Sequence, residues 1–123
     1  MLSLPPSVKI FVARQPTDMR KAFDGLSAMV TEVIKLDPLS GHLFVFINKR
    51  RNRMKVLWWD RGGYWLLYKR LERGTFDVGA WDFASEESIE VRASELMLVL
   101  DGIDVRGVRR RPRHEIGRSS RKK

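Results

Sequence analysis

Apolar residues in the first third of the chain follow two different spacings. They alternate with other residues over residues 8–12, which predicts a short strand. From residue 18 to residue 35 they recur at intervals of three and four, which is typical of one face of an α-helix. Thr17 and Asp18 are suitable residues for its N-terminal cap, and Pro38 disfavours helical geometry at the residue before it. The pattern predicts one long amphipathic helix over residues 18–35.

The middle of the chain changes to the pattern of strands. Residues 42–48, 53–59 and 64–71 are rich in β-branched and aromatic side chains, as strands are. A basic segment at 49–52 and a glycine-containing segment at 60–63 separate them, and connections of this length form hairpins. We therefore predict an α+β fold in which an antiparallel β-meander packs against the long amphipathic helix. Because residues 42–48 are apolar on both faces, their strand is expected to be central.

The C-terminal part is predicted to hold only short elements. Residues 76–83 are aromatic but irregular in spacing, and they allow no assignment. Residues 89–91 suggest a short strand, after which Ser94 can cap a short C-terminal helix that stops near Gly102. Residues 106–123 have few large apolar groups and cannot bury enough surface to offset the entropy of ordering them. We therefore expect a single domain over residues 1–105 and a disordered arginine-rich tail over 106–123.

Composition excludes several classes of protein. The chain has 123 residues and no cysteine, which removes disulfides, thiolate zinc sites and cysteine nucleophiles. Two histidines, His42 and His114, and scattered carboxylates give no clustered ligand pattern, so we predict no metal, no cofactor and no enzymatic activity, and we rank a metal-dependent nuclease last. No apolar run is long enough to span a bilayer and no signal peptide is recognisable. A cytoplasmic protein is expected.

Charge is divided sharply along the chain. The formal net charge is +9, from 24 Lys and Arg against 15 Asp and Glu. Residues 49–73 carry 9 basic and 2 acidic groups, residues 77–104 carry 1 and 8, and residues 106–123 carry 9 and 1. The acidic block at 77–104 could fold back on the basic hairpin or pair with a basic partner protein. Most of the net charge therefore belongs to the tail.

Two basic segments are candidates for binding nucleic acid. Cations track phosphates and release counterions, while flat rings can stack on exposed bases. In the hairpin, aromatic side chains follow the cations; alternation places Trp58 and Trp59 on opposite faces, and burial in the sheet is the alternative for both. For the tail, the alternatives are a solubilising segment or a dock for an acidic protein. The predicted contacts are Lys49, Arg50, Arg51, Arg53 and Lys55 in the hairpin and Arg109, Arg110, Arg111, Arg113, Arg118 and Arg121 in the tail.

Five blocks of sequence, in order, resemble a known family. They read TDMRKAFDGL at 17–26, GHLFVF at 41–46, KVLWWD at 55–60, YKRLERG at 68–74 and ELMLVLDGID at 95–104. Together they resemble the small accessory protein, the TnpB-like product of the second reading frame, of the insertion-sequence-66 transposon family. The basic tail lies outside these blocks.

The resemblance implies a role in bacterial DNA transposition beside a separate, larger transposase that carries the catalytic site. It carries no catalytic residue onto this chain. The leading hypothesis is thus a non-catalytic accessory factor that binds DNA and assists the transposase, with the acidic C-terminal part engaging the transposase or another element-encoded protein. The alternative hypothesis is a protein-protein adaptor that docks on the transposase without binding DNA. The oligomeric state stays open.

Overall fold

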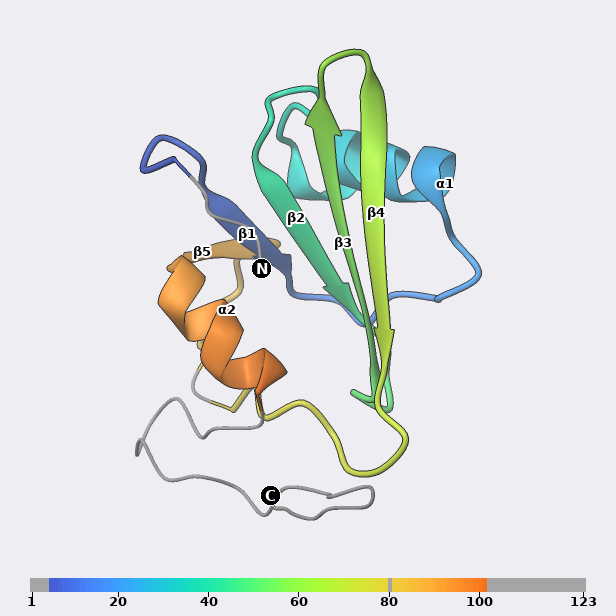
Figure 1. Ribbon diagram of the computed structural model, residues 1–123, viewed down its shortest axis with the longest axis vertical. Helices are drawn as coiled ribbons and strands as arrows, with labels where there is room; N and C mark the ends of the chain where they lie inside the picture. The colour runs from blue at the N-terminus through green and yellow to red at the C-terminus, as the bar shows by residue number, and fades with distance from the viewer. Residues whose placement is uncertain (1–4, 80, 102–123) are drawn as a thin grey trace.

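The chain folds around one mixed β-sheet with helical segments on both faces (Figure 1). The computed structural model describes residues 5–79 and 81–101. The predicted tail at 106–123 and the predicted domain boundary at 105 lie outside these residues. In chain order the elements are β1 (Ile10–Ala13), α1 (Phe23–Met29), η1 (Val30–Ile34), β2 (Leu43–Ile47), β3 (Arg53–Asp60), β4 (Gly63–Arg70), β5 (Ser88–Val91) and α2 (Ala93–Leu100).

The sheet has five strands in the order β4-β3-β2-β1-β5. Strands β2, β3 and β4 pair antiparallel, as in the predicted meander. The meander is nevertheless the wrong description of the whole sheet, because β1 pairs with β2 in parallel and β5 joins the other side of β1. A parallel pair requires a crossover connection, and the segment through α1 and η1 provides it. The first strand begins two residues later than predicted, at Ile10.

The predicted long helix over residues 18–35 is also wrong. The helical segment covers 12 residues, seven in α1 and five in the π-helical η1. Before it, Thr17 donates its backbone N–H to the carbonyl of Ile47 at 2.9 Å, and the Asp18 carboxylate accepts the Arg20 N–H at 2.9 Å. The Asp18 bond is of the kind that an N-terminal cap makes, but only a turn follows at residues 19–20, and the helix begins at Phe23 after the cap residue Ala22. At the other end, Lys35 adopts the left-handed conformation, with φ 67°, and stops the helix.

Two apolar layers hold the sheet between its helices. Strand β2, which is buried along its whole length, is the middle strand, as predicted, and its side chains alternate between the layers. The layer under α1 and η1 contains Ala13, Leu26, Val30, Ile34, Phe44, Phe46 and Leu57. The layer under α2 contains Ile10, Val12, Leu43, Val45, Ile47, Met54, Val56, Phe76, Trp81, Val91, Leu96 and Val99.

The aromatic segment that the sequence left unassigned completes the second layer. Phe76 and Trp81 are buried there. The backbone N–H of Phe76 donates to the carbonyl of Arg51 at 2.7 Å, and that of Leu71 donates to Asn52 at 2.8 Å. The chain from Leu71 to Phe76 therefore runs beside the loop between β2 and β3 and fixes it from one side.

The short C-terminal helix begins earlier than predicted. Its N-terminal cap is Arg92, not Ser94. The Glu95 carboxylate accepts the backbone N–H of Arg92 at 2.8 Å, which satisfies a donor that the first helical turn leaves free. No helix within residues 5–79 and 81–101 is long and apolar enough to cross a membrane.

Candidate nucleic-acid interface

The loop between β2 and β3 is held in one conformation by hydrogen bonds of Asn48. Its side-chain oxygen accepts the backbone N–H groups of Asn52 and Arg53, both at 3.0 Å, and its amide nitrogen donates to Asn52 at 2.8 Å. Arg51 occupies the left-handed region with φ 59°, and its N–H donates to the Asn48 carbonyl at 3.0 Å. The backbone that carries the basic residues is thus fixed before any ligand arrives.

The five predicted hairpin cations do not form one surface. Lys49, Arg50 and Arg53 line an open hollow of about 490 Å³ between this loop and residues 17–20. Arg51 lines a second hollow of about 290 Å³ next to Trp81, and Lys49 reaches that one as well. The loop therefore presents cations on two sides.

Lys55 lies inside the protein. It is 6% exposed, and its Nζ donates to the carbonyls of Met19 at 2.8 Å and Lys21 at 2.7 Å. The same ammonium lies 4.7 Å from the centre of the Tyr68 ring, within the range of a cation–π interaction. Lys55 was predicted to contact nucleic acid, but its ammonium is bound within the fold. There it attaches the segment before α1 to β3.

Arg20 is a basic residue of the hollow that sequence reasoning missed. Its side chain is 91% exposed and binds the Asp18 carboxylate, with the shortest distance 2.7 Å. The hydrogen bonds from Arg20 lower the pKa of Asp18 from 3.8 to about 2, and the pair raises the pKa of Arg20. The sequence signal that could have identified this pair is an acidic and a basic residue two positions apart, Asp18 and Arg20. Of the charged groups lining the hollow, four are cations and one is a carboxylate.

Tyr68 is an exposed aromatic residue in the wall of the same hollow. Strand β4 places it opposite Lys55 in the pairing with β3. Its hydroxyl oxygen accepts a hydrogen bond from Nη1 of Arg53 at 2.8 Å. The ring is thus fixed by Arg53 at its hydroxyl and by Lys55 beneath its face.

The two adjacent tryptophans of β3 lie on opposite faces of the sheet and are both half-buried. Trp58 stacks against Trp65 at 6.1 Å, and Trp59 meets the Tyr64 ring edge-on at 5.1 Å. Trp65 itself is 56% exposed and Leu67 is 51% exposed. Because β4 is an edge strand, these two side chains form an exposed apolar strip at the side of the sheet.

The acidic block does not neutralise the loop within the described residues. The ion pairs there join Arg14 to Glu87, Arg20 to Asp18, Arg70 to Glu72 and Arg92 to Glu95, and none reaches the cations at 49–53.

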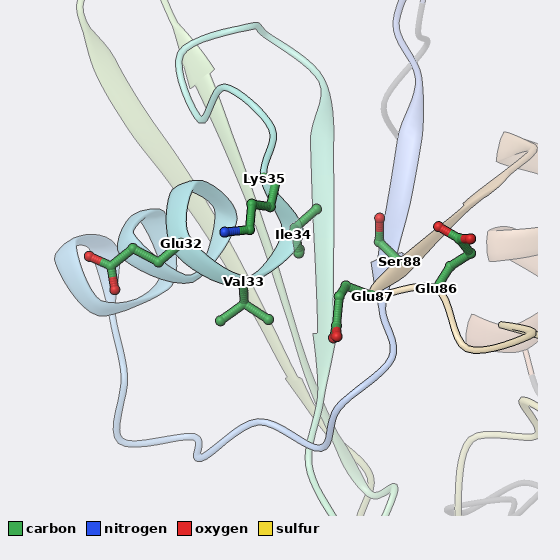
Figure 2. A pocket seen from close by; sticks show the side chains of 7 residues that line it. All are labelled: Glu32, Val33, Ile34, Lys35, Glu86, Glu87 and Ser88. Carbon is green, nitrogen blue, oxygen red and sulfur yellow. The ribbon is translucent and has the colours of Figure 1, made fainter.

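Glu86 and Glu87 lie instead by a third hollow, of about 550 Å³, between η1 and β5, which Glu32 and Lys35 also line. Figure 2 shows that the three carboxylates point in different directions. In the part of the chain that the structure describes, no group of three or more acidic, histidine or cysteine side chains could hold a metal ion. His42 accepts the backbone N–H of Lys9 at its Nδ1, at 2.9 Å.

Fold and surface together define a small α+β domain with a rigid basic loop beside an exposed tyrosine. The chain belongs to the IS66 Orf2-like family, whose model matches residues 8–110, and this confirms the resemblance to the insertion-sequence-66 family. "Uncharacterized protein y4hO" of Sinorhizobium fredii is 41% identical over 106 residues, covering 86% of this chain and 90% of that protein. "Uncharacterized protein y4jC" of the same organism is 33% identical over 112 residues, covering 91% and 93%. No solved structure matches the chain.

Proposed function

We propose that this protein is a non-catalytic accessory factor of DNA transposition, acting in the bacterial cytoplasm, and that it binds DNA and assists a separate transposase. Family membership supports the process. The observation that carries DNA binding is the loop of β2 and β3, where Lys49, Arg50 and Arg51 are exposed on a backbone fixed by hydrogen bonds.

The loop is suited to phosphate because the backbone that carries its cations needs no reorganisation. Each Lys or Arg that neutralises a phosphate releases condensed counterions, and a fixed backbone reduces the entropy lost on binding. Arg53 adds charge in the first hollow, whereas the charge of Arg20 is paired with the Asp18 carboxylate. Lys55 acts by positioning, since its ammonium is already bound to two carbonyls.

The tail is proposed to make a second, non-specific contact with DNA. Its six candidate cations lie outside the described residues and are assigned by charge alone. The exposed carboxylates of the acidic block, such as Glu86 and Glu90, are proposed to engage the transposase or another element-encoded protein.

The test is fluorescence anisotropy with a labelled DNA duplex, measured with full-length protein at several salt concentrations. Lys49, Arg50 and Arg51 are replaced together by Gln in the loop variant. The control variant carries Gln at Lys9, Lys35 and Arg61, three exposed cations outside the loop between β2 and β3 that line neither of its two hollows. It removes the same total charge.

We expect the loop variant to reduce the slope of log K against log salt by about 2 to 3, since each phosphate contact contributes about 0.9. The control variant should change the slope by less than about 1. Absence of binding by the unmodified protein at low salt would disprove DNA binding. A loop variant with the unmodified slope would leave only the tail as a contact, and Gln at Arg109, Arg110, Arg111 and Arg113 should then abolish binding.

A second candidate function is an adaptor that docks on the transposase without binding DNA. It is favoured by the exposed strip of Trp65 and Leu67 on the edge strand β4, because exposed strand edges are templates for pairing with another chain. Copurification with the transposase that survives nuclease and moderate salt would support it. Gln at both positions should then remove copurification, whereas unchanged copurification would exclude this strip.

A further inference from the structure

The aromatic ring in the basic hollow has the Lys55 ammonium over one face, and about half of the residue is exposed. Beneath Tyr68 lies the buried Lys55 ammonium, 4.7 Å from the ring centre. At its edge the hydroxyl is bound by Arg53 at 2.8 Å. The residue remains 49% exposed. Few rotamers of this side chain can satisfy both contacts, so the exposed surface of the ring has a fixed orientation.

Four cations line the same hollow as this ring. Lys49, Arg50 and Arg53 come from the rigid loop and its following strand, and Arg20 comes from the segment that Lys55 attaches to β3. Arg53 uses one donor on the tyrosine, and a guanidinium has five. It can therefore bind a phosphate while still orienting the ring.

A ring fixed in this way offers a surface on which an unpaired base can stack. Phosphate contacts on a duplex do not require such a surface. In a duplex each base has neighbours stacked on both faces, so a protein side chain cannot stack on it unless the base is unstacked. In a single strand, base faces are free, and proteins that bind such strands combine aromatic platforms with cations along the backbone. The hollow has both parts, and its open shape admits a strand from the side.

We propose that this hollow binds single-stranded DNA, with one base stacked on Tyr68 and the adjacent phosphates bound by Lys49, Arg50 and Arg53. The proposal rests on the DNA-binding function proposed above, and it names the form of DNA that this site selects. Unpaired DNA would be the strand that a transposase exposes when it opens or cuts an element end.

The experiment compares anisotropy for a labelled single-stranded oligonucleotide and for a duplex of equal phosphate number, using the full chain. Tyr68→Leu removes the ring and keeps an apolar side chain, while Tyr68→Phe keeps the ring and removes the hydroxyl. Trp65→Leu is the matched control, because it removes an exposed aromatic from the same strand but outside the hollow. Urea unfolding of each variant verifies the fold.

We expect the unmodified protein to bind the single strand more tightly than the duplex. Tyr68→Leu should weaken single-strand binding by about 5- to 150-fold, the range for loss of one stacked base, and should change duplex binding by less than about 2-fold. Tyr68→Phe and Trp65→Leu should each stay within about 3-fold for both DNAs. Equal losses on both DNAs for Tyr68→Leu, or no preference in the unmodified protein, would overturn the proposal while leaving DNA binding intact.

A second measurement needs no variant. An oligonucleotide containing 5-iodouracil is irradiated in complex with the unmodified protein, and the crosslinked peptide is identified by mass spectrometry. The crosslink is expected in the peptide that contains Tyr68. Crosslinks found only in other peptides would refute stacking at this position. Binding of neither DNA form at low salt would overturn the proposed function itself.

Discussion

Replacing Lys55 by Met tests the buried ammonium that attaches the segment before α1 to the sheet. Methionine preserves most of the aliphatic stem and its packing but has no hydrogen-bond donor. The carbonyls of Met19 and Lys21 then lose the donor that now lies 2.8 and 2.7 Å away. The Tyr68 ring loses the cation beneath it. All three losses weaken the contact between the segment at 19–21 and β3.

The size of the effect follows from these contacts. Leaving a buried acceptor without its donor costs about 1 to 3 kcal/mol, and loss of a partly desolvated cation–π contact adds about 0.5 to 2 kcal/mol. Two terms offset this cost: the ammonium no longer has to be desolvated, and the Lys21 carbonyl, in an exposed residue, can bind water instead. We expect the free energy of unfolding to fall by about 2 to 4 kcal/mol.

Urea unfolding followed by tryptophan fluorescence measures this change. With an m-value of about 1.5 kcal/mol/M, within the range for small domains, the midpoint should fall by about 1.3 to 2.7 M. The matched control is Lys21→Met, because Lys21 is exposed and only its backbone carbonyl enters the contact. Its effect should stay below about 0.5 kcal/mol, as for ordinary surface substitutions.

A loss for Lys55→Met no larger than that of Lys21→Met would refute the reasoning. It would mean that the two carbonyls are hydrated at no cost and that the ammonium contributes nothing to the position of residues 19–21. An altered m-value would instead indicate a change in the unfolded or native ensemble. That result would also contradict a local loss of contacts.

Three further substitutions have definite expected outcomes. Lys35→Gly should stabilise the protein by about 0.5 to 1 kcal/mol, because φ is 67° there and glycine adopts that conformation without strain; equal or lower stability than Lys35→Ala in urea would contradict this. Phe76→Ala should cost about 3 to 5 kcal/mol, since the residue is 2% exposed, whereas Val78→Ala, at a partly buried position, should cost less in the same assay. The pKa of Asp18 is lowered from 3.8 to about 2, so its carboxylate stabilises the fold above pH 4 and this contribution is lost as the pH falls toward 2. Stability measured from pH 5 to pH 2 should therefore decline less for Asp18→Asn, and parallel curves would be inconsistent with this pair.

Local patterns in the sequence predicted the antiparallel part of the fold well. Alternation and turn residues placed β3 within one residue of its observed Arg53–Asp60, because both signals are carried by neighbouring positions. They did not predict the parallel pairing of β1 with β2, which depends on where the crossover returns the chain. They also extended the helix too far, because Asp18 does make the cap-type bond to the Arg20 backbone N–H, yet only a turn follows it and the helix begins at Phe23.

The candidate site could be predicted as a set of residues but not as a surface. The charge run identified the loop cations, yet their division between two hollows depends on the left-handed Arg51 and on the hydrogen bonds of Asn48. Lys55 has the sequence pattern of an exposed cation beside the others. Its burial comes from acceptors 34 and 36 positions earlier in the chain, and only tertiary structure brings such groups together.

The position of β1 has a consequence for how the protein is synthesised. The strand leaves the ribosome early, but one of its two neighbours is β5, whose Val91 pairs with Ile10. Until that late strand is translated, one edge of β1 has no partner. Nascent or prematurely terminated chains that lack β5 would present an open edge able to pair with other chains. Completion of the sheet is thereby linked to translation of almost the entire described region, and partial products are expected to aggregate or be degraded.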